Sequence, residues 1–331
     1  MYNDKYAIMN KQVKIMSGWL GMSNEKLFFR DNSHPSTGLG DYITDLIQAL
    51  DQKKYKRTIE VHFNAQPCLS TKPKYLILLE HKYIRPQNYL FNPRSYEKIF
   101  GWDLSLHQHN NFIYTRYPHS YSMGVYNQYR PLKYVMFCSN RNLIFGNANH
   151  SLYNKRHDVI NFCENNKMNF QLYGAGWEFA PVSAGVLNYT VNKLQILKKF
   201  RKNADLNCYR GIAKSKELIL KQAQFNFCFE NIAEYPGYVS EKIWDSLAAG
   251  TIPVYWPSWR IPEDYLPSDA YIDASTFPCM SSLFDYLESL STEEVLERQV
   301  YCLEVARKSL NKVSNNNYTN LILEQLKGEY L

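Results

Sequence analysis

One segment in the last third of the chain combines residue types that suit a charged ligand. It runs Phe229-Glu-Asn-Ile-Ala-Glu-Tyr-Pro-Gly-Tyr-Val-Ser-Glu-Lys-Ile-Trp-Asp-Ser-Leu-Ala-Ala-Gly250, from the end of an apolar strand pattern into a helical one. Ser240 is a suitable N-cap for this helix, and Gly250 suits its C-terminal end. Lys242 then lies in the first turn, where the helix dipole disfavours a cation by about 0.3–1 kcal/mol. A lysine beside the free N–H groups of a helix start makes an anion site suited to a phosphate.

The neighbouring Glu241 adds a carboxylate, which can accept hydrogen bonds from the hydroxyl groups of a ribose or another sugar. The alternative is that Glu241 and Lys242 are ordinary exposed residues of a helix start, because charged first turns are common. The residue types alone do not decide between these two interpretations.

The second part of the chain alternates between strand and helix patterns. The expected strands are 134–138, 170–173, 225–229, 251–255 and 270–273, and the expected helices are 152–163, 214–223, 240–249, 280–290 and 292–310. This alternation predicts an α/β fold with a parallel sheet covered by helices on both faces. Ligands of such sheets bind at the carboxyl ends of the strands, which is where Glu230 lies.

The first part predicts shorter strands with longer polar connections. The expected strands are 13–16, 75–79, 98–102 and 112–115, with one amphipathic helix over 41–50. A Tyr/Ser/Pro/Gly-rich stretch over 117–131 is typical of a linker. We therefore expect a first domain over 1–130, a second over 131–312 and a C-terminal helix within 313–331. Whether that helix packs back on the first domain or touches a membrane stays open.

Composition narrows the class of protein. The chain has 331 residues, of which 45% are hydrophobic and 21% charged, which predicts two globular domains and excludes a disordered chain. No apolar run is long enough to span a membrane and no signal peptide is evident, so we expect a soluble protein. The 7 cysteines form no C-x-x-C pair, which favours reduced thiols and a cytoplasmic location.

The net charge of +7 suits nucleic acid, an anionic membrane surface or a phosphorylated ligand. No nucleic-acid-binding signature accompanies the basic groups, so no nucleic acid partner is expected. Peripheral contact with the inner face of the membrane is left open.

Three motifs carry a family resemblance. Phe229-Glu-Asn231, Tyr238-Val-Ser-Glu-Lys242 and Ala249-Gly-Thr-Ile-Pro-Val-Tyr255 together resemble the donor-binding signature of glycosyltransferase family 10, the α-1,3/4-fucosyltransferases, here as a soluble member of bacterial type. Ser240 stands where threonine is usual, which keeps the hydroxyl cap. The match covers roughly residues 214–278, with a weaker one over 134–165.

The resemblance implies a GT-B fold, in which two Rossmann-like domains face a cleft and the second domain holds GDP-fucose. It also implies an inverting reaction that needs no metal and no other cofactor. The chain has no Asp-x-Asp, the carboxylate pair expected to hold a divalent cation on the donor diphosphate. Protein cations are therefore expected to neutralise that diphosphate.

The same resemblance implies roles for individual residues. Arg156 is expected to be the second phosphate cation, with Lys155 as the competing residue, because a guanidinium binds pyrophosphate bidentately. Glu80 follows an apolar strand and is expected to be the general base, with Asp103 in reserve. For Arg156 and Glu80, the alternative is an exposed charge at the end of an element.

The donor-binding residues expected beside Glu241 and Lys242 are Glu230, Asn231 and Tyr238. A carboxylate satisfied within its own turn is the alternative for Glu230, and packing onto its own helix is the alternative for Tyr238.

The sequence therefore predicts a fucosyltransferase that moves L-fucose from GDP-fucose to a hydroxyl of an N-acetylglucosamine-containing glycan, with α-1,3 linkage favoured over α-1,4. One alternative is a GT-B transferase that uses another nucleotide sugar. The other is a relic that binds a glycan or nucleotide without catalysis.

Overall fold

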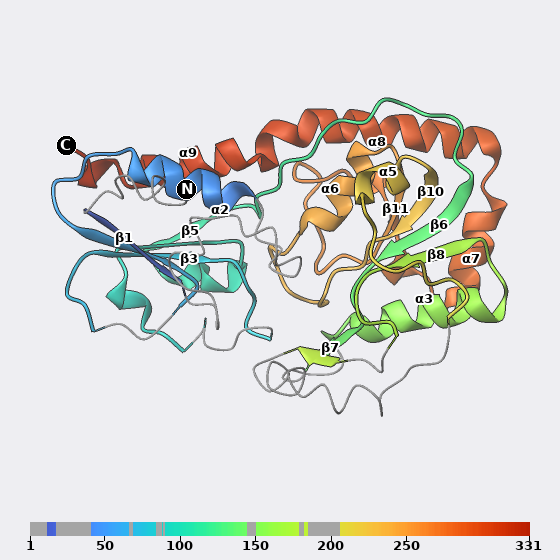
Figure 1. The fold of residues 1–331 in the computed structure, drawn as a ribbon, viewed down its shortest axis with the longest axis horizontal. Helices are drawn as coiled ribbons and strands as arrows, with labels where there is room; N and C mark the ends of the chain where they lie inside the picture. The colour runs from blue at the N-terminus through green and yellow to red at the C-terminus, as the bar shows by residue number, and fades with distance from the viewer. Residues whose placement is uncertain are drawn as a thin grey trace, which may run out of the picture. The chain divides into compact units, whose positions relative to one another are not determined.

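The computed structural model describes residues 12–17, 41–65, 69–83, 88, 90–143, 150–178, 182–184 and 206–331 (Figure 1). The chain divides into two compact units, which we call unit 1 (Met1–Ser120 with Asn311–Leu331) and unit 2 (Tyr121–Leu310). The first boundary lies within the linker-like stretch 117–131. The second lies near the end of helix α8 (Thr292–Val313), so that helix contributes residues to both units.

Unit 1 contains a parallel sheet in which each described strand pairs with its neighbours along the chain, in the order β1-β2-β3-β4-β5. The strands are β1 (Val13–Ser17), β2 (Ile59–Phe63), β3 (Lys74–Leu78), β4 (Lys98–Gly101) and β5 (Phe112–Tyr114). Two short 3-10 helices, η2 (Pro93–Ser95) and η3 (Leu104–Gln108), precede and follow β4. Because parallel strands point the same way, the residues that follow β2, β3 and β4 lie along one edge of the sheet.

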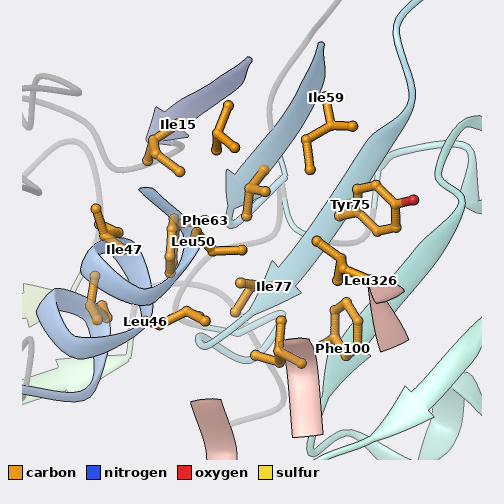
Figure 2. Packing of buried hydrophobic residues seen from close by; sticks show 14 of the residues in the cluster. Ile15, Leu46, Ile47, Leu50, Ile59, Phe63, Tyr75, Ile77, Phe100 and Leu326 are labelled. Atoms are coloured by element: carbon orange, nitrogen blue, oxygen red, sulfur yellow. The ribbon is translucent and has the colours of Figure 1, made fainter. Parts of the chain in front are cut away.

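One apolar core cluster of unit 1 lies between this sheet and the helices α2 (Asp41–Asp51) and α9 (Asn315–Gln325), which pack beside each other. Figure 2 shows labelled core side chains from these elements: Leu46, Ile47 and Leu50 from α2, and Ile15, Phe63, Ile77 and Phe100 from the strands. Each side chain of this size contributes about 1.5–3 kcal/mol when fully buried. The predicted amphipathic helix over 41–50 is therefore confirmed.

Strand β2 is the one strand of the unit 1 sheet that the sequence did not predict. Its polar residues Glu60 and His62 are 1% and 0% exposed, because both faces of the sheet are covered here. His62 Nε2 lies 3.4 Å from the Glu60 carboxylate, and its Nδ1 lies 3.1 Å from the Tyr96 hydroxyl. Burial lowers the pKa of His62 despite the opposing effect of Glu60, so the neutral ring is favoured.

The C-terminal residues of unit 1 continue from α9 through the 3-10 helix η8 (Lys327–Glu329). Tyr330 forms an antiparallel bridge with Tyr55, and Glu329 makes an ion pair with Arg57. These contacts join the end of the chain to the segment just before β2.

Unit 2 contains a second parallel sheet, in the order β12-β11-β10-β6-β8. Its strands are β6 (Leu132–Phe137), β8 (Phe170–Tyr173), β10 (Ala223–Phe227), β11 (Ile252–Tyr255) and β12 (Ile272–Asp273), and β7 (Arg141–Leu143) and β9 (Val182–Ala184) form a separate parallel pair. Along the chain β6 is the first strand of this sheet and β8 is the second. In the sheet β8 lies on one side of β6, and β10, β11 and β12 follow in turn on the other side. This is the 2-1-3-4-5 order of a doubly wound sheet, whose direction reverses between β6 and β10.

Helices cover both faces of this sheet (Figure 1). They are α3 (Tyr153–Asn165), α5 (Lys216–Leu220), α6 (Glu241–Ala248), α7 (Met280–Ser289) and α8, with the 3-10 helices η6 (Ser268–Ala270) and η7 (Ala274–Thr276). On one face, the ring centroid of Phe284 in α7 lies 5.3 Å from those of Tyr134 and Phe227. On the other, Asn226 Nδ2 donates to Ser246 Oγ of α6 at 2.8 Å. Alternate residues of β10 therefore face α7 and α6.

The buried Arg130 anchors the start of β6 to the C-terminal end of α6. Its guanidinium donates to the carbonyl oxygens of Ala249 (2.8 Å), Ala223 (2.7 Å) and Leu220 (3.1 Å). A cation is favourable at helix C-termini, where carbonyl groups lack partners within the helix. Arg130 thus helps to fix the helix whose other end carries Lys242.

Within the residues that the structure covers, no helix has both the length and the apolar composition required to cross a bilayer.

Candidate functional site

The N-terminal end of α6 is built as the sequence predicts. Ser240 is the N-cap, and its Oγ accepts from the main-chain N–H of Lys242 at 3.5 Å. At the other end Gly250 has φ +66, a left-handed conformation that suits glycine. Both predicted ends of this helix are confirmed.

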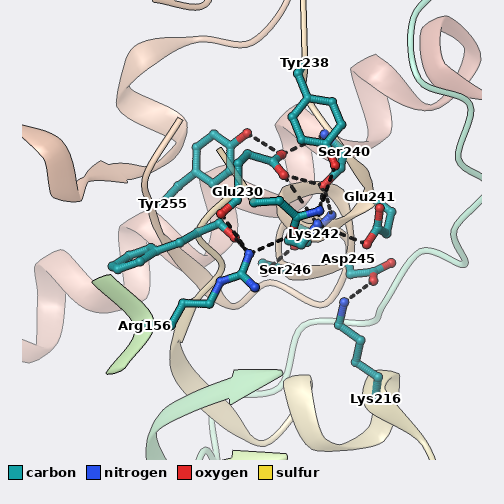
Figure 3. Close-up of polar contacts among 12 residues, drawn as sticks. Arg156, Lys216, Glu230, Tyr238, Ser240, Glu241, Lys242, Asp245, Ser246 and Tyr255 are labelled. Carbon is teal, nitrogen blue, oxygen red and sulfur yellow. Dashed lines mark hydrogen bonds and ion pairs between the residues drawn. The ribbon is translucent and has the colours of Figure 1, made fainter. Parts of the chain in front are cut away.

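Glu230 lies at the centre of the site, beyond the carboxyl end of β10 (Figure 3). It is 0% exposed. One carboxylate oxygen accepts from the Ser240 N–H (2.8 Å) and the Tyr255 hydroxyl (2.7 Å), and the other accepts from Ser240 Oγ (2.8 Å) and Lys242 Nζ (3.4 Å). Both oxygens are therefore engaged by protein donors. Glu230 lies at the strand end, as predicted. Its carboxylate binds the first residues of α6, Ser240 and Lys242, within the protein.

The ammonium group of Lys242 is held among oxygen atoms. Besides Glu230, its Nζ lies 2.9 Å from Ser240 Oγ and 3.6 Å from the Glu241 carboxylate. Burial disfavours its charged form, but the charges of Glu241 and Glu230 outweigh burial and raise the pKa of Lys242 above its usual range. Lys242 therefore stays a cation at the helix start.

Arg156 reaches the same place from α3, on the other side of the switch between β6 and β10. Its Nη2 lies 2.8 Å from the carbonyl oxygens of Phe229 and Glu230 and 2.9 Å from Asn231 Oδ1. The residue is 5% exposed, and its guanidinium carbon lies 4.6 Å from the Tyr153 ring centroid. Arg156 and Lys242 thus both contact Glu230, one through its main chain and one through its side chain.

The competing residue Lys155 points elsewhere. Its Nζ lies 5.4 Å from the Trp256 ring centroid and 3.7 Å from Asp158. Its side chain is 43% exposed. The geometry therefore favours Arg156 as the cation of the site.

Cys138, which follows β6, forms the other side of the switch point. Burial raises the pKa of its thiol to about 11, although the charges of Arg156 and Lys242 act to lower it. Its carbonyl oxygen accepts from Trp177 Nε1 at 2.8 Å. The same oxygen packs against Gly174, where an added Cβ atom would lie 1.9 Å from it. The two cations are thus close to the carboxyl ends of both β6 and β10, where ligands of doubly wound sheets bind.

The remaining donor-side residues border this cluster. Asn231 Nδ2 donates to the Tyr238 hydroxyl at 3.3 Å, and Tyr238 is largely buried. The side chain of Glu241 is 37% exposed. The structure therefore brings all six predicted unit 2 residues together. Tyr255 ends the third family motif, but no feature of the sequence indicated that its hydroxyl would bind Glu230.

Glu80 lies in unit 1, two residues beyond the end of β3. Its main-chain N–H donates to Asn64 Oδ1 at 3.3 Å, and its carbonyl oxygen accepts from Asn88 Nδ2 at 2.9 Å. Asp103, the reserve candidate, is buried and caps η3 by accepting from the Ser105 N–H at 2.9 Å. The carboxylate of Asp103 thus has a structural role as a helix cap. The assignment of Glu80 as the base stays a prediction from the sequence.

The part of the chain that holds the cation pair matches a known family. Residues 148–302 match the model described as glycosyltransferase family 10 (fucosyltransferase), C-terminal domain. This stretch of the chain is therefore similar to the C-terminal domain of that family. The match includes Arg156 and the whole segment from Glu230 to Tyr255, so the resemblance in the sequence is confirmed.

Two curated relatives are similar over shorter stretches. An α-(1,3)-fucosyltransferase FucT of Helicobacter pylori is 38% identical over 81 residues, which is 24% of this chain and 16% of the relative. A GDP-fucose protein O-fucosyltransferase 3 of Xenopus laevis is 32% identical over 111 residues, 33% of this chain and 22% of the relative. The aligned stretches thus span less than a quarter of these relatives' own lengths.

A solved structure extends the similarity of fold to almost the whole chain. A crystal structure of an α1,3-fucosyltransferase with GDP-fucose matches 96% of this chain and 89% of its own, with a TM-score of 0.51 and 14% identity. At this identity the match shows the fold, which is GT-B-like: two α/β units, each with a parallel sheet. The predicted fold class is confirmed.

Proposed function

We propose that this chain is a fucosyltransferase that uses GDP-fucose as its donor. The observation that carries the proposal is the cation pair Arg156 and Lys242 at the switch point of unit 2, inside a family 10 domain. Two fixed cations at the carboxyl edge of a doubly wound sheet suit a nucleotide diphosphate. The matched crystal structure is that of an α1,3-fucosyltransferase with GDP-fucose, which supports this choice of donor.

The reaction that we propose is a direct displacement with inversion at the sugar carbon. Glu80 removes the proton of the acceptor hydroxyl, whose oxygen attacks C1 of fucose while the bond from C1 to the diphosphate breaks. Arg156 and Lys242 stabilise the charge that grows on the departing GDP. Glu241 binds the ribose, and Asn231 and Tyr238 border the donor.

We further propose that no metal takes part. The support is the absence of Asp-x-Asp from the sequence together with the two protein cations. Equal rates with and without EDTA are expected, and recovery of activity only on addition of Mn²⁺ or Mg²⁺ would contradict this part.

For the acceptor we propose an N-acetylglucosamine-containing glycan, with α-1,3 linkage favoured. The similarity to the Helicobacter pylori α-(1,3)-fucosyltransferase supports the α-1,3 linkage. The similarity to the Xenopus protein O-fucosyltransferase favours a second candidate, a hydroxyl side chain of a protein. The two candidates share the donor site and differ in the acceptor alone.

Donor choice is tested first. Thermal shift with GDP-fucose, UDP sugars and CDP sugars separates the nucleotides, because a ligand at 100 times its Kd stabilises the folded state by about 2.7 kcal/mol. We expect stabilisation by GDP-fucose and GDP alone. Lys242→Ala should weaken GDP binding in calorimetry, and an unchanged Kd would remove the phosphate role of Lys242.

Catalysis is tested by GDP release with N-acetyllactosamine and with serine- or threonine-containing peptides, followed by mass spectrometry of the products. NMR of the product gives the linkage and shows whether the anomeric configuration has inverted. Glu80→Gln should bind GDP as wild type does and lose transfer. GDP binding without transfer to any acceptor would favour the non-catalytic alternative.

A further inference from the structure

The backbone of Leu79 and Glu80 is held by side chains from three separate segments of unit 1. Asn64 Oδ1 accepts from the main-chain N–H groups of Leu79 (3.1 Å) and Glu80 (3.3 Å). The carbonyl oxygen of Leu79 accepts from Trp102 Nε1 at 3.1 Å, and that of Glu80 accepts from Asn88 Nδ2 at 2.9 Å. All four polar main-chain groups of these two residues are therefore bonded to side chains.

Asn64 itself has a backbone conformation that few side chains adopt. It follows β2 directly with φ +63, and it is 0% exposed. Among the non-glycine residues that the structure describes, only Lys167 and Glu234 also have positive φ. This left-handed region is unfavourable for L-residues, although asparagine tolerates it better than most. Residues held in it concentrate at functional sites.

The side-chain amide of Asn64 has a forced orientation. Its Oδ1 receives a third hydrogen bond from Asn88 Nδ2 at 2.9 Å, so three N–H groups converge on this one atom. Rotating the amide would turn its own NH₂ group toward those donors. Asn64 Nδ2 is consequently buried without a hydrogen-bond partner, which is unfavourable for folding. The three hydrogen bonds that Oδ1 accepts offset this unfavourable effect.

We propose that Asn64 and Asn88 are positioning residues for Glu80. Asn64 fixes the main-chain N–H of Glu80, and Asn88 fixes its carbonyl oxygen. The proposal rests on the proposed function, in which Glu80 is the general base. A base must lie within hydrogen-bond reach of the proton that it removes, and a misplacement of about 1 Å can lower the rate by about 10²-fold. Asparagine supplies the required oxygen without a second negative charge, which would disfavour the charged form of Glu80.

The test compares Asn64→Gly with wild type in the full chain, using GDP-fucose and N-acetyllactosamine. Glycine keeps the left-handed backbone and removes Oδ1. We expect kcat to fall by about 10- to 100-fold, since the proton transfer is misplaced. The KM for GDP-fucose should stay within about twofold, because the donor contacts lie in unit 2.

Two further variants separate positioning from a general loss of structure. In a Glu80→Gln background, Asn64→Gly should lower the remaining rate by less than about twofold, because residues that act as one unit are not additive. Lys167→Gly is the matched control, because it releases an exposed left-handed residue far from Glu80 in sequence, in unit 2. Its kcat should equal that of wild type.

Asn64→Asp is the conservative variant. It keeps an oxygen in place of Oδ1 and should retain more activity than Asn64→Gly. Activity of Asn64→Asp no higher than that of Asn64→Gly would contradict the role of Oδ1 as the acceptor for the Glu80 segment.

The outcomes distinguish the two proposals. Loss of transfer in Glu80→Gln with full activity in Asn64→Gly overturns the positioning role and leaves the base assignment intact. An equal loss from Asn64→Gly in both backgrounds also overturns it, because Asn64 would then act elsewhere. Full activity of Glu80→Gln, or an inactive wild-type chain, overturns the proposed function, and the positioning role fails with it.

Discussion

In the first turn of α6, Nζ of Lys242 lies 3.4 Å from Oε2 of Glu230, and both atoms contact the Oγ of Ser240. Glu230 is fully buried. Burying a charge is costly unless it is paired and hydrogen-bonded, so Lys242, whose side chain is 17% exposed, helps to make the full burial of the Glu230 carboxylate possible. The pair thus differs from an exposed ion pair, which contributes about 0–1 kcal/mol.

Glu230→Gln should weaken GDP binding by about 10-fold, or about 1.4 kcal/mol. The amide turns an NH₂ group toward the Ser240 and Lys242 donors, so the ammonium loses its fixed position. The substitution also makes the site more positive, which alone would strengthen diphosphate binding. Calorimetry therefore separates the two effects, and tighter binding would show that Glu230 serves only to offset charge.

Tyr255→Phe is the matched variant for this experiment. It removes one hydrogen bond to Glu230 and changes no charge. We expect an intermediate loss of affinity and a fall in the free energy of unfolding of about 0.5–1.5 kcal/mol.

Arg156→Ala should lower kcat by about 10²- to 10³-fold, as the loss of a group that stabilises developing charge does elsewhere. Arg156→Lys should recover only part of the rate, because an ammonium group cannot reproduce the planar guanidinium that meets the carbonyls of Phe229 and Glu230. The measurement is steady-state GDP release. Lys155→Ala is the control and should stay within about twofold of wild type. A large fall in kcat for Lys155→Ala, with a small fall for Arg156→Ala, would show that Lys155 rather than Arg156 is the phosphate cation.

Gly174→Ala should strongly destabilise unit 2. Gly174 has φ +146, and a Cβ atom added there would lie 1.9 Å from the carbonyl oxygen of Cys138. That oxygen belongs to the backbone at the end of β6, so relief requires movement of the switch point itself. We expect the free energy of unfolding to fall by more than about 3 kcal/mol in urea denaturation.

Gly211→Ala provides the comparison for this substitution. Gly211 also has a positive φ, +78, but nothing lies within 4 Å of an added Cβ. The free energy of unfolding of Gly211→Ala should fall only by the strain of an alanine in the left-handed conformation, about 1–2 kcal/mol. Equal losses at the two positions would show that strain rather than the clash governs Gly174.

The sequence predicted the parts of the site that depend on local pattern. The cap at Ser240, the left-handed Gly250 and the cation at Lys242 follow from spacing along one helix, and the structure has all three helix features. It could not predict that Tyr255, from the next strand, would bind Glu230, because register between parallel strands is a tertiary property. It named Glu230 from its strand-end position, but not the four donors that surround it.

The missed strand has a similar cause. β2 is buried on both faces, but the polar residues Glu60 and His62 interrupt the apolar pattern by which a buried strand is recognised. These two residues can be buried because their side chains contact each other inside unit 1. Asn64, which follows that strand, went unnoticed for the same reason. Its left-handed backbone and its contacts with the Glu80 segment come from residues separated by 15 and 16 positions.

The last prediction concerns the acid stability of unit 1. Arg57 Nε and Nη2 donate to the two carboxylate oxygens of Glu329 at 2.7 and 2.6 Å, and the Tyr75 hydroxyl donates to one of them at 3.0 Å. The bonds from Arg57, followed by that from Tyr75, outweigh burial and hold the pKa of Glu329 below its ordinary value of 4.5. A carboxyl whose pKa is lowered by folding stabilises the native state above its ordinary pKa, and this contribution is lost as the pH falls toward the folded value.

Glu329→Gln should therefore be less stable than wild type at about pH 7, and the difference should shrink as the pH falls below about 4.5. Urea denaturation across this range, followed by a probe of unit 1, measures both curves. Glu324→Gln is the control, because Glu324 makes an exposed pair with Lys327 and should leave the shape of the curve unchanged. Parallel curves for wild type and Glu329→Gln would mean that the contact between Arg57 and residue 329 stabilises unit 1 without the charge of Glu329.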